Sequence, residues 1–126
     1  MKNLRYNNGV KEERAIKMEK SQVQLLAFQL IAHSGDALNH FNLAVDHAEE
    51  GNFEEAKQEI SEGDKALIEA HKAQSEMLVS EARDEVIEYS VIMMHAQDHL
   101  MTTLNFERFA KRFISLYKKI MIKEKE

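Results

Sequence analysis

No proline interrupts this sequence, and only four of its 126 residues are glycine. Proline breaks helices and glycine weakens them, so a chain nearly free of both can sustain long helices but offers few residues for tight turns. Good helix formers such as Ala, Glu, Lys and Leu are plentiful. A chain of this length is expected to form one hydrophobic core. These features together predict a single all-α domain.

Three windows of the sequence place apolar residues at steps of three and four, which is the spacing of one helix face. The first window covers about residues 21–50, and its stripe consists of Val23, Ala27, Leu30, Ala37, Phe41, Ala44 and Ala48. The second covers 53–81, where a coiled-coil-like seam consists of Phe53, Ala56, Ile60, Gly63, Leu67, Ala70, Gln74 and Met77. The third covers about 88–122. We therefore expect an antiparallel three-helix bundle.

The boundaries between these windows differ in clarity. Gly51 suits the left-handed position after a helix, and Asn52 with Glu55 three residues later is typical of a capping box that starts the next helix. The charged segment 81–85 breaks the second seam and predicts a loop, although it contains neither glycine nor proline. Residues 1–18 are polar and predict a flexible extension. The helical domain is then 19–122, with a short tail at 123–126.

Composition and charge exclude several kinds of function. There is no cysteine, so disulfides, thiolate metal sites and a cysteine nucleophile are excluded. No phosphate-binding glycine loop or Gly-x-Ser-x-Gly motif is present. Residues 41–90 carry fourteen acidic against four basic residues, which argues against nucleic acid as a partner. The sequence has no signal-peptide core and no run of about 18 apolar residues, so we expect a cytoplasmic protein.

The stretch MMHAQDHLMTT, residues 93–103, places His95, Asp98 and His99 in an apolar part of the third helix. Burying ionisable groups costs several kcal/mol unless they are paired or bind a metal. Three interpretations follow: hydrogen-bonded core residues, a metal site, or a histidine that attacks phosphorus as a nucleophile. The third helix is apolar almost all round at this level, which favours a second buried surface and hence an oligomer.

A second group of histidines recurs at intervals of seven in the first helix, namely His33, His40 and His47. Such a ladder could bind metal, but histidines at the edge of an apolar helix face are ordinary. We therefore favour a structural interpretation for these three residues and assign them no role.

The sequence YSVIMMHAQDHLMTT, residues 89–103, closely resembles the signature of the lactose/cellobiose-type IIA component of the bacterial phosphoenolpyruvate-dependent sugar phosphotransferase system. The resemblance extends to LIAHSGDA at 30–37, EEGNFEEA at 49–56 and EAHKAQSEML at 69–78, and it covers roughly residues 19–121. It implies a homotrimer of three-helix protomers that transfers phosphoryl groups in disaccharide transport.

The resemblance also implies a role for each motif residue. His95 would be phosphorylated on Nε2, receiving the phosphoryl group from the phosphocarrier protein HPr. It would donate that group to a cysteine of the IIB component, and the IIC membrane permease would be involved only indirectly. Asp98 would share one divalent cation, Mg²⁺, with its copies in the other two protomers. His99, Gln97, His71 and Gln74 would support the site.

The alternative class is a non-enzymatic metal-binding or regulatory helical protein that retains the fold. The sequence does not identify the sugar, because a IIA component never contacts it.

Overall fold

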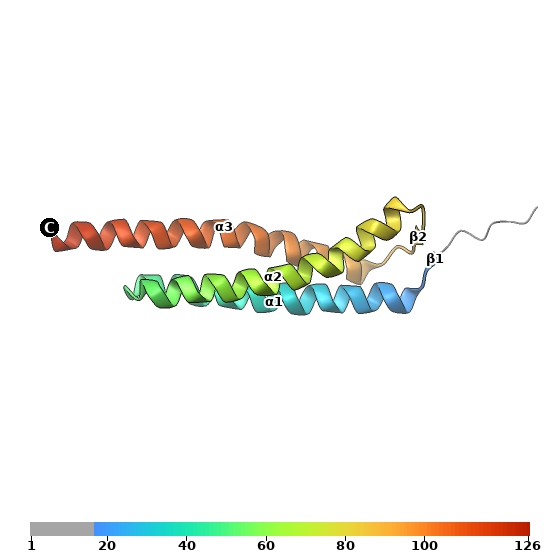
Figure 1. Ribbon diagram of the computed structural model, residues 1–126, viewed down its shortest axis with the longest axis horizontal. Coiled ribbons are helices and arrows are strands. Elements are labelled where there is room, and N and C mark those ends of the chain that lie inside the picture. The colour runs from blue at the N-terminus through green and yellow to red at the C-terminus, as the bar shows by residue number, and fades with distance from the viewer. Residues whose placement is uncertain (1–16) are drawn as a thin grey trace, which may run out of the picture.

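The computed structural model describes residues 17–126. Three long helices lie side by side: α1 (Lys20–Glu49), α2 (Phe53–Ala82) and α3 (Val91–Lys125). α1 and α3 run in the same direction, and α2 runs antiparallel to both (Figure 1). The predicted all-α fold of three packed helices is confirmed.

The ends of the helices differ from the predicted bounds mainly in α3. α1 and α2 begin and end within one residue of the predicted positions, whereas α3 begins at Val91 rather than at 88. The helix also continues to Lys125, through most of the predicted tail. At the other end, the last two residues of the predicted extension form strand β1 (Lys17–Met18), and residues 1–16 lie outside the described residues.

The core lies mainly against α1, because α2 and α3 each pack on α1 more extensively than on one another. The predicted stripes of the first two helices are buried or half-buried at every position. Phe41, Leu30 and Leu100 are the largest fully buried apolar side chains, and most of the remaining core is alanine. Small side chains let helix axes approach closely. Within residues 17–126, none of the helices is long and apolar enough to cross a membrane.

The turn between α1 and α2 is built around Gly51, which has a φ of 83°. The Asn52 N–H donates to the His47 carbonyl at 2.8 Å, and the Gly51 N–H donates to the Ala48 carbonyl at 3.1 Å. This is the Schellman pattern, and it confirms the predicted role of Gly51. The prediction of a capping box at Asn52 was wrong, because the Asn52 side chain does not cap α2. It donates instead to Glu50 Oε2 at 3.4 Å.

The connection from α2 to α3 uses a second Schellman turn. Asp84 takes the left-handed conformation with a φ of 59°, and the Glu85 N–H donates to the Ser80 carbonyl at 3.1 Å. Strand β2 (Val86–Ile87) then pairs in parallel with β1, before the Ser90 side chain caps α3 by accepting from the Met93 N–H at 3.3 Å. The residues of this strand pair were predicted to belong to the flexible extension and to the loop before the third helix.

Candidate functional site

His95 and His99 form a pair on one flank of α3. Four residues apart on a helix, they lie one above the other. Their Nε2 atoms are 3.1 Å apart, and the rings meet edge to face with centroids 4.6 Å apart and an interplanar angle of 89°. His95 is exposed and His99 is half-buried. One ring therefore donates a hydrogen bond to the other, while the exposed ring of His95 stays accessible to another molecule.

The orientation of this flank is fixed by packing against α1. Ala96 and Leu100 are fully buried, and Thr103 is nearly so. The Thr103 hydroxyl donates to the Ser34 carbonyl at 3.3 Å, which joins α3 to the middle of α1. Because this buried face sets the rotation of α3, the two histidines lie at the edge of the helix interface rather than inside it.

Gln97 and Gln74 are brought together on the other side of α3. Gln74 Nε2 donates to Gln97 Oε1 at 2.8 Å, and both side chains are half-buried between α2 and α3. Gln97 follows His95 by two residues, which is a rotation of roughly 200° around the helix. Within one protomer, the predicted site therefore divides into a histidine pair on one flank and a glutamine pair on the opposite flank.

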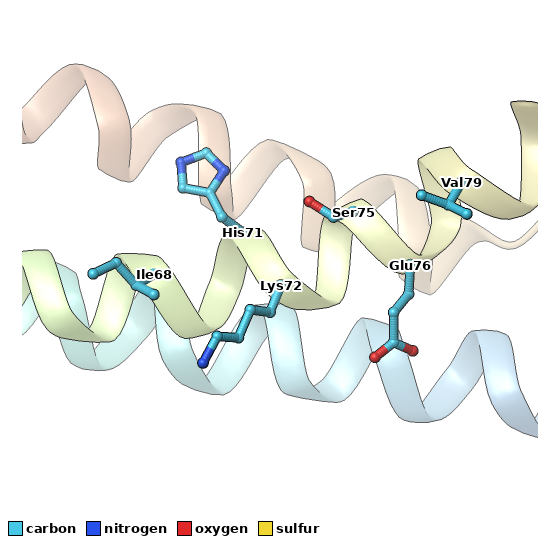
Figure 2. Close-up of a pocket in the computed structure, with 6 residues that line it drawn as sticks. All are labelled: Ile68, His71, Lys72, Ser75, Glu76 and Val79. Carbon is cyan, nitrogen blue, oxygen red and sulfur yellow. The ribbon is translucent and has the colours of Figure 1, made fainter.

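His71 lies one turn before Gln74 on the exposed surface of α2. It helps to line a shallow depression formed by Ile68, His71, Lys72, Ser75, Glu76 and Val79. Figure 2 shows His71, Ser75 and Val79 on one side of α2, and Lys72 and Glu76 on the other. Ile68 and Val79 were not predicted from the sequence. Both residues belong to a second stripe with steps of three and four residues, which runs beside the predicted seam. That spacing could have identified them in the sequence.

Asp98 points outward from α3, in the middle of a long exposed stripe. Its members recur at steps of three and four and are all exposed: Val91, Met94, Asp98, Met101, Asn105, Phe109, Phe113, Leu116 and Ile120. Met94 is 53% exposed, and Met101 and Phe109 are each 56% exposed. Apart from Asp98 and Asn105, the stripe is apolar. An apolar surface of this length normally marks an interface with another protein.

Of the three interpretations, that of hydrogen-bonded core residues does not hold within the single protomer, in which His95 and Asp98 are exposed. Among the described residues, no group of three His, Asp or Glu side chains in one protomer could hold a metal ion. A metal site at Asp98 would therefore need ligands from other copies of the chain.

Two histidines of α1, His33 and His40, lie near acidic residues. His40 Nδ1 lies 2.6 Å from Glu59 Oε2, and its Nε2 lies 3.6 Å from Asp36 Oδ1. His33 is close enough to Glu69 to lower the pKa of that carboxyl, after the larger effect of Lys72. These contacts support the structural interpretation of His33 and His40.

A second charged cluster joins α2 to α3. Lys111 Nζ lies 2.5 Å from Glu107 Oε1 and 3.9 Å from Asp64 Oδ2. Burial, followed by the hydrogen bond to Glu107, raises the pKa of Asp64. Burial alone would raise the pKa of Glu107, but hydrogen bonds with Lys111 and Asp64 lower it. Asp64 is thus the carboxyl of this pair that binds a proton more readily. The pairing was not predicted from the sequence.

Comparison with known proteins finds the same family that the sequence motifs resemble. A family model described as "PTS system, Lactose/Cellobiose specific IIA subunit" matches residues 25–118, which include every predicted site residue. The lactose-specific EIIA component of Staphylococcus epidermidis is 43% identical over 102 residues, covering 81% of this chain and 98% of that protein. The lactose-specific EIIA component of Streptococcus mutans is 38% identical over 102 residues, covering 81% of this chain and 98% of its own length.

Solved structures are also similar over most of the chain, including the following two. The cellobiose-specific enzyme IIA from Bacillus anthracis has a TM-score of 0.79 and 40% sequence identity, covering 84% of this chain and 95% of that one. PtcA from S. mutans has a TM-score of 0.78 and 38% identity, covering 80% of this chain and 99% of that one.

Proposed function

Because this chain belongs to the lactose/cellobiose-specific IIA family of the phosphotransferase system, we propose that His95 carries the phosphoryl group that such a component transfers. The protein is a phosphoryl-transfer component of a disaccharide phosphotransferase system. The observation that carries the assignment to His95 is its exposed ring, with Nε2 held 3.1 Å from His99 Nε2.

The proposed reaction requires one particular tautomer of the histidine pair. A neutral imidazole attacks phosphorus through the ring nitrogen that carries a lone pair. The productive tautomer carries the proton of His95 on Nδ1, so that His95 Nε2 accepts from His99 Nε2–H before the reaction. This hydrogen bond breaks as phosphorus approaches, because the single lone pair of His95 Nε2 must then form the N–P bond. As the new N–P bond forms on His95 Nε2, the bond from phosphorus to the donor breaks. The His99 N–H can then donate to a phosphoryl oxygen.

The partners follow from the family. HPr is the proposed donor, a cysteine of the IIB component is the proposed acceptor, and the IIC permease is involved only through IIB. Donor, phosphorus and acceptor must lie in line during each transfer. Both partners therefore need access to the same nitrogen, and the exposed position of His95 on the surface of α3 allows this.

We also propose that the exposed stripe of α3 is the contact between three copies of the chain. The stripe is apolar along most of the helix, and a symmetric assembly would bury it on every copy. Asp98 would then lie near the common axis with its two counterparts. Three carboxylates so placed repel one another unless a cation neutralises them.

Asp98 is chemically suited to hold Mg²⁺, because hard cations prefer carboxylate oxygens. The cation would supply positive charge at the axis and would stabilise the assembly. We assign it no part in the transfer of the phosphoryl group, since Asp98 points outward between the two flanks of α3.

The experiment that tests the carrier role is incubation with phosphoenolpyruvate, enzyme I and HPr, followed by intact-mass measurement at alkaline pH, which preserves phosphohistidine. The expected result is the gain of one phosphoryl group per chain in the native protein and none in His95→Ala. His40→Ala is the matched control and should gain the group normally. A native protein that gains nothing, or a His95→Ala variant that still gains it, would refute the assignment.

A further inference from the structure

We propose that three copies of Asn105 form a binding site for a small inorganic anion on the axis of the assembly. The inference rests on the proposed threefold contact along the α3 stripe. It assigns a role to Asn105, which is the second polar residue of that stripe after Asp98. The anion would lie two helical turns from the Asp98 carboxylates and would take no part in the transfer of the phosphoryl group.

The first observation is the position of Asn105 on α3. It follows Asp98 by seven residues, which is within roughly 20° of two full turns and about 10 Å along the helix. Asn105 therefore faces the same axis as Asp98, and threefold symmetry brings its three copies to one level. Met101 and Phe109 lie one turn to either side, and each is 56% exposed in the protomer. In the assembly, the polar layer is thus enclosed between two apolar layers.

The second observation is that the Asn105 amide has unused donors. Within residues 17–126 its side chain makes no hydrogen bond. Burying an amide without a partner is unfavourable, so the three amides must pair with one another or with a ligand. Each amide has two N–H groups. A ring in which every Nδ2 donates to the Oδ1 of the next copy leaves one N–H on each amide. Three such donors near the axis suit a single acceptor.

The charge around this layer decides which acceptor it takes. Arg108 follows Asn105 by three residues, and helical side chains lean toward the N-terminus, so Arg108 is expected to extend over the turn that holds Asn105. Arg112 lies one turn further along. Both arginines are exposed, and neither forms an ion pair with any residue that the structure describes.

The nearest acidic residue in the sequence does not offset this charge. Glu107 lies roughly 200° around the helix from Asn105, and there its Oε1 accepts from Lys111 Nζ at 2.5 Å. The layer is therefore surrounded by positive charge, which favours an anion over a cation or a water molecule. The bulky side chains of Met101 and Phe109 favour a small anion such as a halide.

Bromide tests the site directly, because its anomalous X-ray scattering identifies it in a crystal. The native full-length chain is crystallised with bromide as the halide. We expect one anomalous peak on the axis of the trimer, at the level of Asn105. An axis that holds only water at this level, amides that pair with one another without bromide, or bromide found only at surface arginines would overturn the proposal.

Thermal unfolding tests the same site in solution, with bromide replacing gluconate at constant ionic strength. A ligand that binds only the assembled state stabilises it. We expect bromide to raise the Tm of the native protein relative to that of Asn105→Leu, which reports the general effect of the salt. An apolar residue at this position is compatible with a helical seam, so that variant should still assemble. Equal responses of the two proteins to bromide would contradict the proposal.

Two further variants control the comparison. Asn39→Leu changes an exposed asparagine of α1 and should keep the native response to bromide. Arg108→Gln should need about tenfold more bromide for the same rise in Tm, the usual effect of losing a charged hydrogen bond. Loss of the response in Asn39→Leu, or an unchanged response in Arg108→Gln, would count against the site.

Failure of this site and failure of the proposed function are distinguished. A native protein that light scattering shows to be monomeric would refute the threefold assembly and the anion site with it. A trimer without bromide on its axis would refute the anion site alone. A trimer that binds bromide there but is not phosphorylated on His95 would refute the carrier role alone.

Discussion

Gly63 determines how closely α2 approaches α1. A Cβ atom built on Gly63 would lie 2.4 Å from Phe41 Cε1 and 2.8 Å from Phe41 Cδ1. The Phe41 ring is fully buried, so it has little room to move aside. The glycine in the middle of the predicted seam is thus a packing requirement, although glycine is otherwise unfavourable inside a helix.

Gly63→Ala should therefore lower the free energy of unfolding by about 1–3 kcal/mol, the usual cost of overpacking a core. Gly35→Ala is the matched control, since nothing in the protomer lies within 4 Å of a Cβ atom added there. That variant should gain about 0.5–1 kcal/mol from better helix propensity. Urea unfolding measures both, and equal stability of the two variants would contradict this account of the core.

Asp64 offers a test through pH. Its pKa is raised by burial and by Glu107, so the folded protein binds this proton more tightly than the unfolded chain does. The group therefore favours folding in acid and loses that contribution as pH rises. Asp64→Asn should have the higher Tm at neutral pH, and its advantage should narrow as the pH falls. Thermal unfolding across pH tests this, and a variant less stable than the native protein at neutral pH would contradict it.

At the scale of the element, the clearest contrast is between the two turns. The sequence predicted the end of α1 because Gly51 occupies the left-handed position. The end of α2 has the same hydrogen-bond pattern, but Asp84 occupies the left-handed position. Because glycine is the usual residue there, an aspartate did not indicate the end of the helix. The start of α3 was misplaced because residues 86–87 pair with 17–18, a long-range contact that no local pattern reports.

Asp84→Gly should stabilise the protein by up to about 1 kcal/mol, since glycine adopts the left-handed conformation without steric cost. Asp84→Val should destabilise it by about 1–2 kcal/mol, the cost of a left-handed conformation for a residue with a bulky Cβ. Chemical denaturation of the two variants beside the native protein gives the comparison. If valine were tolerated as well as glycine, α2 would not end in the turn described here.

At the scale of the whole molecule, the sequence motif was enough to propose the site residues, but their division between the two flanks of α3 could not be predicted from it. The spacing of His95 and His99 sufficed to place them together, as found. The bond between Gln74 and Gln97 depends on the register between α2 and α3, which tertiary packing sets. The continuous exposure of the α3 stripe likewise emerges only when α1 and α2 cover the other faces of the helix.

The proposed assembly predicts that Asp98→Leu forms a trimer without a divalent cation, because an apolar axis needs no neutralising charge. Sizing by light scattering, with and without a chelator, should show a trimer in both conditions for this variant. The native protein should depend on the cation. Met101→Asp is the matched control and should weaken assembly by adding a charge to the same stripe. A monomeric Asp98→Leu variant would contradict the proposed role of the stripe.

The proposed function requires that this protein relay a phosphoryl group to a second protein rather than merely acquire one. Its most direct test begins with the isolated phosphorylated protein, freed of enzyme I and HPr and mixed with a lactose- or cellobiose-type IIB component. Intact-mass measurement of both chains over time should show the phosphoryl group leaving this protein as a cysteine of IIB gains it. A phosphorylated protein that loses the group to water at the same rate with and without IIB would contradict the relay.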